Sequence, residues 1–287
     1  KIHFQKRKAP SQSININKEA IKPSELGVCI YPTLLGEIVT KESINKIPTH
    51  CRITLKYGRF FYLCIPKTLK KIEIKPVLKD SIVAIDPGER IFSSFYSPVL
   101  EGQIGIKCRD RLGICFKESD KIKSKMYKEK IKIKKLKGRQ RKNAKNKQKR
   151  RKRKFLSVIS KPTRLSQELH YKTALFLCKN FHTILIPEYS SKDTAKNLCE
   201  IVNRSNQGLS HYSFRTRLKH TAKRYNRKVH IVPESYTTMT CTDCGYLNEK
   251  YTNEYLTCSN CNLEIHRDKR GSRNIYIKNV LWFKDNI

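Results

Sequence analysis

Acidic residues and long hydrophobic runs are both scarce in this sequence. Its 287 residues include 24 Asp and Glu against 62 Lys and Arg, which leaves a formal charge of +38. No apolar run approaches the roughly 18 residues that span a bilayer, and neither a lipidation motif nor a basic amphipathic helix with an aromatic face is present. The hydrophobic content of 38% is enough for a folded core. These properties favour a globular protein that binds polyanions, nucleic acid above all, over a membrane protein.

Cysteine, in contrast, is abundant. The sequence has 11 cysteines and no signal peptide at its start, so we expect a reducing compartment rather than secretion. Four of them form two Cys-x-x-Cys pairs, Cys241/Cys244 and Cys258/Cys261. Four thiolates match the tetrahedral preference of Zn²⁺, and two pairs at this separation are typical of a zinc ribbon. Because four thiolates leave no open coordination position, the pattern predicts a structural zinc.

Four acidic residues stand at the ends of predicted elements. Asp86, Glu188 and Glu234 each follow a short apolar strand closely, and Asp268 opens the last predicted helix, just after the cysteine pairs. Acids at the tips of neighbouring strands can converge on divalent cations, and Mg²⁺ prefers carboxylate ligands. Taken alone, Asp86 followed by Pro-Gly is equally compatible with an ordinary turn.

The order of elements indicates the fold. Three strands, a helix, a strand, a helix, a strand, the cysteine-rich insertion and a final helix follow one another from Ser81 onward. This is the chain order of a ribonuclease H-like (RuvC) fold, an α/β fold with a mixed sheet. We expect a basic tail or upstream remnant at 1–25, a small, partial β-barrel at 26–78, the ribonuclease H-like core at 79–240 with a basic helical segment at 120–180, the ribbon at 241–265, and the final helix at 266–287.

Two segments concentrate the basic residues. From Asp120 to Lys154 the chain is nearly all Lys and Arg, and its second half has no apolar face. A charge run is often only a solvated tail, but this density favours a surface that follows phosphates. The cluster Arg150–Lys154 also fits a nuclear import signal. With the basic helix expected near Arg215, the candidate nucleic-acid-binding residues are Lys147, Arg150, Arg151, Arg153, Arg215, Arg217 and Lys219.

At these motifs the sequence resembles the TnpB family of transposon-encoded RNA-guided nucleases, and in particular its Fanzor branch. The matching stretches are IVAIDPGERIFSSFYSP, ELHYKTALFLCKNFHTILIPEY, and SHYSFRTRLKH followed by VPESYTTMTCTDCG, CSNC and HRDKRGSRNI. They lie in the family's order, and the resemblance extends from about Leu26 to the C-terminus. It implies that Asp86 is the first catalytic aspartate and Asp268 the last, with Mg²⁺ as the catalytic metal and Zn²⁺ in the ribbon.

The middle carboxylate departs from the TnpB pattern. There a glutamate follows the apolar strand directly, at the position of Pro187 here. Fanzor-type sequences carry the pattern Glu-x-Tyr-Thr shortly before the ribbon instead, and Glu234 to Thr237 fits it. We therefore expect Glu234 to be the middle ligand, with Glu188 as the alternative. Relatives usually carry Asn at the position of Arg270.

The resemblance also implies partners. Residues 26–75 correspond to part of a wedge domain that holds guide RNA, and the guide pairs with target double-stranded DNA. The expected function is RNA-guided, metal-dependent DNA cleavage for a transposable element. The alternative is a truncated, catalytically inactive remnant that binds RNA or DNA. We expect the nucleus as location if the source is eukaryotic or viral, and the cytoplasm otherwise.

Overall fold

Two units make up the chain in the computed structural model, which describes residues 9, 11–72, 74–78, 81–189, 200–249 and 255–284. The first unit consists of Lys1–Leu69 and Glu118–Ser160, and the second of Lys70–Lys117 and Lys161–Ile287. Each unit has its own hydrophobic core. None of the helices in the described ranges is long and apolar enough to span a membrane.

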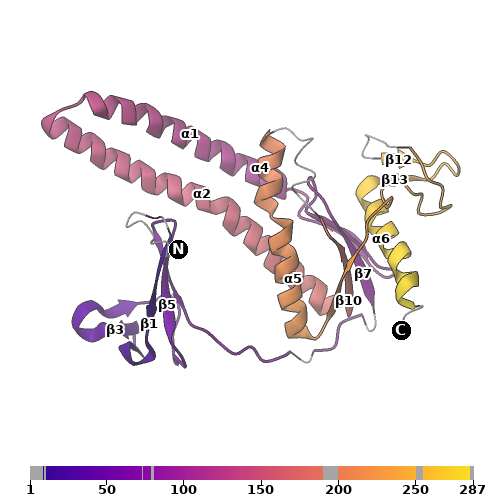
Figure 1. Ribbon diagram of the computed structural model, residues 1–287, viewed down its shortest axis with the longest axis horizontal. Coiled ribbons are helices and arrows are strands. Elements are labelled where there is room, and N and C mark those ends of the chain that lie inside the picture. Colours follow the sequence, from indigo (N-terminus) through magenta and orange to yellow (C-terminus); the bar gives the residue numbers. More distant parts are fainter. Residues whose placement is uncertain are drawn as a thin grey trace, which may run out of the picture. The chain divides into compact units, whose positions relative to one another are not determined.

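A five-stranded mixed sheet organises the second unit (Figure 1). The strands β7 (Ile82–Pro87), β8 (Ser93–Tyr96) and β9 (Glu101–Ile104) form an antiparallel meander. The strands β10 (Thr183–Pro187) and β11 (Lys228–Val232) run parallel to β7, which gives the order β11-β10-β7-β8-β9. The predicted mixed α/β sheet is thereby confirmed. Its central strands are short apolar runs, as expected of strands that are buried on both faces.

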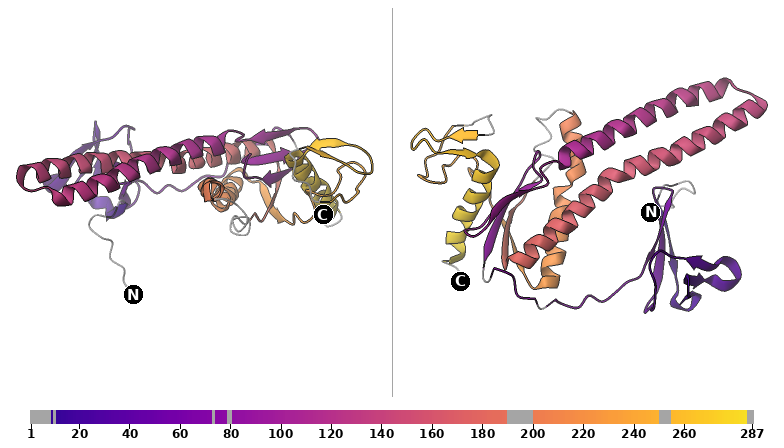
Figure 2. Two further views of the ribbon diagram at one scale, coloured as in Figure 1. Left: turned by 90° about the horizontal axis from the view of Figure 1, so that it is seen from above. Right: turned by 180° about the vertical axis from the view of Figure 1, so that it is seen from behind.

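Five helices are described. The first two, α1 (Cys108–Lys135) and α2 (Gly138–Asn180), run antiparallel as a long hairpin (Figure 2). They are followed by α4 (Glu200–Leu209), α5 (His211–Tyr225) and α6 (Arg267–Lys284). Residues 190–199, between β10 and α4, lie outside the described residues.

The two faces of the sheet pack against different helices. Successive side chains of β7 alternate between these two faces. Val83 and Ile85 belong to the larger core, together with residues of α2 and α5. Ala84 belongs to a second core, on the other face, that includes Ile275 of α6. Figure 1 places α5 and α6 on opposite sides of the sheet. Because side chains alternate with a period of two, Asp86 shares the α6 face with Ala84.

The basic half of the helical hairpin is helical, within the basic helical segment expected at 120–180. The segment after Gly138 has no apolar face and is mostly exposed, yet it is part of one continuous helix that extends to Asn180. Lys, Arg and Gln are good helix formers, and an ion pair between Arg151 and Glu129 joins the two arms of the hairpin.

The first unit contains two three-stranded sheets around one core. The first sheet is β1 (Gln12–Ile16), β5 (Cys51–Lys56) and β6 (Phe60–Cys64), and the second is β2 (Ile21–Pro23), β3 (Gly27–Ile30) and β4 (Gly36–Val39), with the short helical turns η1 (Lys18–Ala20) and η2 (Tyr31–Leu35) between strands. The segment expected to be a tail therefore supplies two strands, because β1 pairs with β5 and places Ile16 in the core. Tyr57 and Gly58 form the hairpin turn between β5 and β6, with φ angles of 57° and 61°, values typical of a type I′ turn.

Candidate metal and nucleic-acid sites

The four cysteines of the two Cys-x-x-Cys pairs lie together. Their Sγ atoms are all within 4.8 Å of one another, and Cys241–Cys261 and Cys244–Cys258 are each separated by 3.6 Å. A tetrahedral zinc with Zn–S bonds of about 2.3 Å would separate its sulfurs by about 3.8 Å. The cluster therefore has the donor type, number and spacing to hold Zn²⁺.

Backbone and amide contacts stabilise both Cys-x-x-Cys turns of this cluster. The strands β12 (Tyr255–Thr257) and β13 (Glu264–His266) form a small antiparallel ladder on either side of the second Cys-x-x-Cys turn. The buried Asn248 donates from Nδ2 to the carbonyls of Met239 and Tyr246, both at 3.2 Å, and its Oδ1 accepts from the N–H of Ser259 at 2.9 Å. One side chain thus ties together the turns that carry both cysteine pairs.

Asp86 lies at the end of β7, on the face covered by α6. Its carboxyl group rests against Gly271 of α6, so closely that a side chain on Gly271 would collide with it. Burial, followed by the charges of Asp268 and Glu234, raises the pKa of Asp86 to about 8, while Arg267 acts in the opposite direction. A carboxyl group with this pKa is largely neutral at pH 7 unless a cation compensates its charge.

Asp268 and Glu234 complete this group of carboxylates. Asp268 lies in the first turn of α6 and is partly buried, 3.7 Å from the side chain of Arg267. Glu234 lies two residues beyond β11, and partial desolvation of its carboxyl raises its pKa although the side chain as a whole is exposed. Two acids that are far apart in the sequence therefore lie close enough to Asp86 for their charges to raise its pKa.

Glu188, the alternative to Glu234, is placed differently. It follows β10 directly, its side chain is 76% exposed, and it forms an ion pair with Arg215 of α5 at 3.3 Å. Its charge does not contribute to the raised pKa of Asp86. The alternation along β10 explains this, because Leu185 faces α6 and a residue three positions later falls on the opposite face. The geometry thus groups Glu234, rather than Glu188, with Asp86.

The side chains of Asp86, Glu234 and Asp268 offer oxygen atoms of the kind that divalent cations bind. Oxygen ligands from carboxylates are those that Mg²⁺ prefers. Ser94 lies opposite Asp86 in the β7–β8 ladder, and its buried hydroxyl has no hydrogen-bond partner among the described residues.

Gly271 allows a sharp test of this arrangement. We expect Gly271→Ala to push the Asp86 carboxyl aside and weaken divalent-cation binding at least about tenfold. Folding should be unimpaired, because alanine favours helix by about 1 kcal/mol over glycine. The measurements are Mn²⁺ affinity by electron paramagnetic resonance and thermal denaturation.

The matched control is Gly113→Ala in α1. A Cβ at Gly113 meets no atom within 4 Å, so the same substitution adds helix propensity without touching a carboxylate. Equal Mn²⁺ affinities in the two variants would contradict the placement of Asp86 against α6.

His211, at the start of α5, is a residue that sequence reasoning missed. Its Nε2 bonds the carbonyl of Gly88 at 3.1 Å, in the turn that follows Asp86, and its ring stacks on Phe92 at 5.1 Å. Burial lowers its pKa to about 4, so the ring is neutral at physiological pH and Nε2 carries the proton that Gly88 accepts. A buried, neutral histidine thereby fixes the turn behind the first carboxylate.

Comparisons with known proteins find similar sequences. Residues 211–275 match a family model described as Cas12f1-like, TNB domain. This match runs from α5 through Glu234 and the cysteine cluster to Ile275. Two proteins of Acanthamoeba polyphaga mimivirus are similar over most of the chain. TnpB-like protein L79 is 25% identical over 251 residues, which cover 85% of this chain and 46% of L79.

TnpB-like protein L770 is 26% identical over 256 residues, which cover 87% of this chain and 47% of L770. The chain is similar to these TnpB-like proteins. This confirms the predicted resemblance to the TnpB family, while the assignment to the Fanzor branch stays a prediction. The chain spans about half the length of these two relatives.

Among solved structures, this chain is similar to the one titled "Cryo-EM structure of the Cas12f1-sgRNA-target DNA complex". The sequence identity is 15%, the TM-score is 0.42, and the match covers 95% of this chain and 68% of that one.

The predicted nucleic-acid-binding residues fall into two groups. Arg151 pairs with Glu129, Arg215 pairs with Glu188, and Arg217 lies over the ring of Tyr171 at 4.1 Å. The other candidates are exposed on their helices: Lys147, Arg150 and Arg153 on α2 and Lys219 on α5. Exposed lysines and arginines are the groups that can meet phosphates directly.

Lys219 also borders a basic hollow at the C-terminal end of α5. The hollow has a volume of about 350 Å³ and is lined by Lys71, Lys219, Lys223 and Arg227, with Ala222, Asn226 and Val229, and no acidic residue. Arg227 is held by the carbonyls of Cys178, Asn226 and Ile74, whereas the lysines reach solvent. The hollow is suited to a phosphate group.

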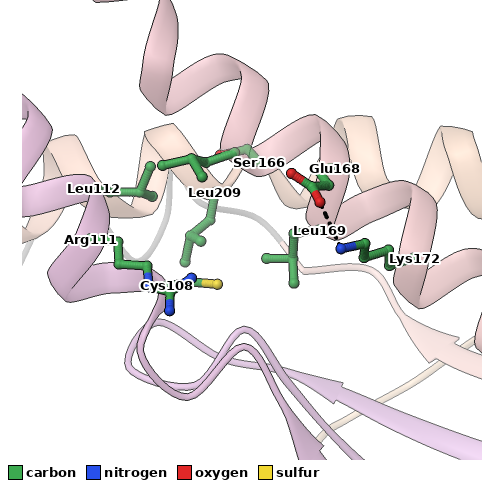
Figure 3. A pocket seen from close by; sticks show the side chains of 9 residues that line it. Cys108, Arg111, Leu112, Ser166, Glu168, Leu169, Lys172 and Leu209 are labelled. Carbon is green, nitrogen blue, oxygen red and sulfur yellow. Dashed lines mark ion pairs between the residues drawn. The ribbon is translucent and has the colours of Figure 1, made fainter. Parts of the chain in front are cut away.

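A smaller pocket lies elsewhere in the second unit (Figure 3). It has a volume of about 180 Å³ and is lined mostly by residues of α1 and α2, with Leu209 at the end of α4. An ion pair between Glu168 and Lys172, 2.6 Å apart, stands at its rim. No predicted site residue lines this pocket. The candidate metal site is therefore the set of three carboxylates, Asp86, Glu234 and Asp268, and not this pocket.

Proposed function

We propose that this chain is the nuclease part of an RNA-guided DNA endonuclease of a transposable element, which hydrolyses phosphodiesters with two divalent metal ions. The observation that carries this proposal is the convergence of Asp86, Glu234 and Asp268 at one edge of the sheet, with a raised pKa at Asp86. The similarity to TnpB-like proteins supports it. The same three residues would be the magnesium ligands.

The chain's own residues account for the chemistry as follows. Asp86 on β7 and Asp268 on α6 would hold Mg²⁺, together with Glu234, which lies just beyond the end of β11. Bound Mg²⁺ would supply positive charge beside the attacking and leaving oxygens. A water oxygen forms a bond to phosphorus as the bond to one sugar oxygen breaks. The water gives up a proton to solvent, and the departing sugar oxygen takes up a proton from solvent. Zn²⁺, in contrast, would stabilise the ribbon between Glu234 and Asp268.

The partners follow from charge and from the relatives. A net charge of +38 binds polyanions over much of the surface. Guide RNA and target double-stranded DNA are the partners that an RNA-guided endonuclease requires, with base pairing supplying sequence specificity. The first unit, with its two small sheets, would hold RNA, in keeping with the wedge-like assignment. Arg150–Lys154 remains a predicted nuclear import signal.

The decisive experiment is to purify the full chain, sequence the RNA that copurifies, and offer DNA complementary to that RNA in the presence of Mg²⁺. Cleavage that depends on Mg²⁺ and on complementarity is the expected result. RNA or DNA binding without any nicking would favour the inactive binding remnant instead.

We further expect the double substitution Lys219→Ala and Lys223→Ala to weaken DNA binding. Each phosphate contact that is lost lowers the slope of log affinity against log salt by about 1, so the slope should fall by about 2. The measurement is fluorescence anisotropy at several salt concentrations. Lys107→Ala, at an exposed lysine outside the hollow, is the control and should lower the slope less. An unchanged slope in the double variant would remove the basic hollow from the binding surface.

A further inference from the structure

One buried amide fixes the loop between Glu234 and the first zinc-site cysteine. Asn274 of α6 is 7% exposed, and its Nδ2 donates to the carbonyls of Thr237 and Thr240, both at 2.7 Å. Both amide hydrogens are therefore used on this loop. A second contact comes from Lys278, one helical turn later, whose Nζ donates to the carbonyl of Ser235 at 3.1 Å.

Hydrogen bonds within the loop connect the Asn274 contact to Glu234. Both the N–H and the hydroxyl of Thr237 donate to the carbonyl of Glu234, at 3.3 and 2.8 Å. Between them Tyr236 has a φ angle of 65°, in the left-handed region that few side chains adopt. The backbone of Glu234 is thus bonded to Thr237, which is bonded to Asn274.

The same helix carries Asp268 and touches Asp86. Asn274 lies three residues after Gly271, which touches Asp86, and six residues after Asp268. Residues three apart lie on adjacent positions of a helix face. The helix α6 therefore bears one of the three carboxylates and contacts the segments that bear the other two.

We propose that Asn274 is a positioning residue for divalent-cation binding. It sets the distance between Glu234 and the other two carboxylates, those of Asp86 and Asp268. This inference rests on the proposed function of the carboxylates. Asn274 touches no carboxylate itself and acts through the backbone of Thr237. It is also bonded to Thr240, the residue before Cys241, so the same amide connects the zinc cluster to the magnesium ligands.

The test is the Mn²⁺ affinity of the zinc-loaded full chain, measured by electron paramagnetic resonance, with Asp86→Asn used to identify the Mn²⁺ bound at the carboxylates. Mn²⁺ serves as probe because it accepts the same oxygen ligands as Mg²⁺. In Asn274→Ala we expect the dissociation constant to rise at least about tenfold, the range seen when groups that orient metal ligands are removed.

A matched control lies on the same helix. Asn279 is as buried as Asn274, 6% against 7%, but its Nδ2 bonds only the carbonyl of Ile275 within α6 among the described contacts. Asn279→Ala should lower thermal stability without changing Mn²⁺ affinity. Should Asn274→Ala fail to fold, Thr237→Val carries the test, because it keeps the shape of the side chain and removes the hydroxyl bonded to Glu234; its Mn²⁺ affinity should fall severalfold.

The outcomes separate the two proposals. Parent-like Mn²⁺ affinity in a folded Asn274→Ala, or in Thr237→Val if the former does not fold, would overturn the positioning role alone. An equal loss in Asn279→Ala would also overturn it, because the effect would then reflect general stability. If the parent chain bound no Mn²⁺ in an Asp86-dependent manner, the proposed function itself would fail, and the inference with it.

Discussion

Asp86→Asn is expected to reduce metal-dependent cleavage by about a thousandfold or more. The charges of Asp268 and Glu234 both raise the pKa of Asp86, so Asp86 is the carboxylate next to which the other two lie. Loss of one ligand to a catalytic metal removes several kcal/mol of transition-state stabilisation. The variant should nevertheless fold. Because the pKa of Asp86 is raised by folding, the folded state disfavours the charged carboxylate above its ordinary pKa, so the neutral amide should leave the metal-free protein at least as stable at neutral pH. Cleavage rates and thermal denaturation measure the two effects.

Glu188→Gln is the matched control for this prediction. Glu188 is also an acid at a strand end, but it is exposed and paired with Arg215. We expect cleavage within a few fold of the parent, since an exposed ion pair contributes at most about 1 kcal/mol. If Glu188→Gln removed cleavage and Glu234→Gln did not, the middle ligand would be Glu188. Activity retained in Asp86→Asn would refute the nuclease site.

Cys258→Ser should have the second large effect, on metal content and local folding. Cys258 is fully buried in the cluster, and the N–H of Asn260 donates to its sulfur at 3.4 Å. A structural zinc contributes about 10–16 kcal/mol of binding free energy that is also folding free energy. We therefore expect zinc to fall from about one equivalent to a small fraction of that, and the ribbon to lose its protection from hydrogen exchange.

Cys115→Ser, on α1, provides the comparison for the zinc prediction. Cys115 is half-buried and stands apart from the cluster. Zinc content by elemental analysis should be unchanged in this variant. If Cys258→Ser kept its zinc and its exchange protection, the cysteine cluster would not be a structural zinc site.

Part of the second unit could be predicted because its central strands, before Asp86 and Glu188, are short apolar runs with clear ends. Runs of this kind are typically buried on both faces. The strand before Glu234 is less apolar, since it contains Lys228 and His230. The mixed sheet, in contrast, is indicated by the order of elements along the chain and not by any single residue.

The choice between Glu188 and Glu234 could have been made from alternation. Pro187 pairs with Val232 in the β10–β11 ladder, and Val232 faces α6. Counting by twos from Val232 reaches Glu234, whereas Glu188 falls one position out of phase. The sequence contained this signal, but it becomes usable only when the register between the two strands is known.

Other features depended on contacts that a sequence pattern does not contain. The strand Gln12–Ile16 is mostly exposed and polar, and it exists because β5 supplies its hydrogen bonds. Gly271 and Asn274 follow Asp268 at three-residue intervals, which places them near one helix face. Their partners, Asp86 and Thr237, lie far away in the sequence, so spacing alone could not assign them.

Both ends of the ribbon are attached to the same helix, and this has a consequence for engineering. Thr240 is bonded to Asn274, and on the return path the N–H of Asp268 donates to the ring of His266 at 3.2 Å. Segments whose two ends are fixed close together on a rigid support tolerate replacement and insertion. The segment between Thr240 and His266 is therefore a suitable place to insert a reporter or another recognition module. We expect such an insertion to leave the spacing of Asp86, Glu234 and Asp268 unchanged.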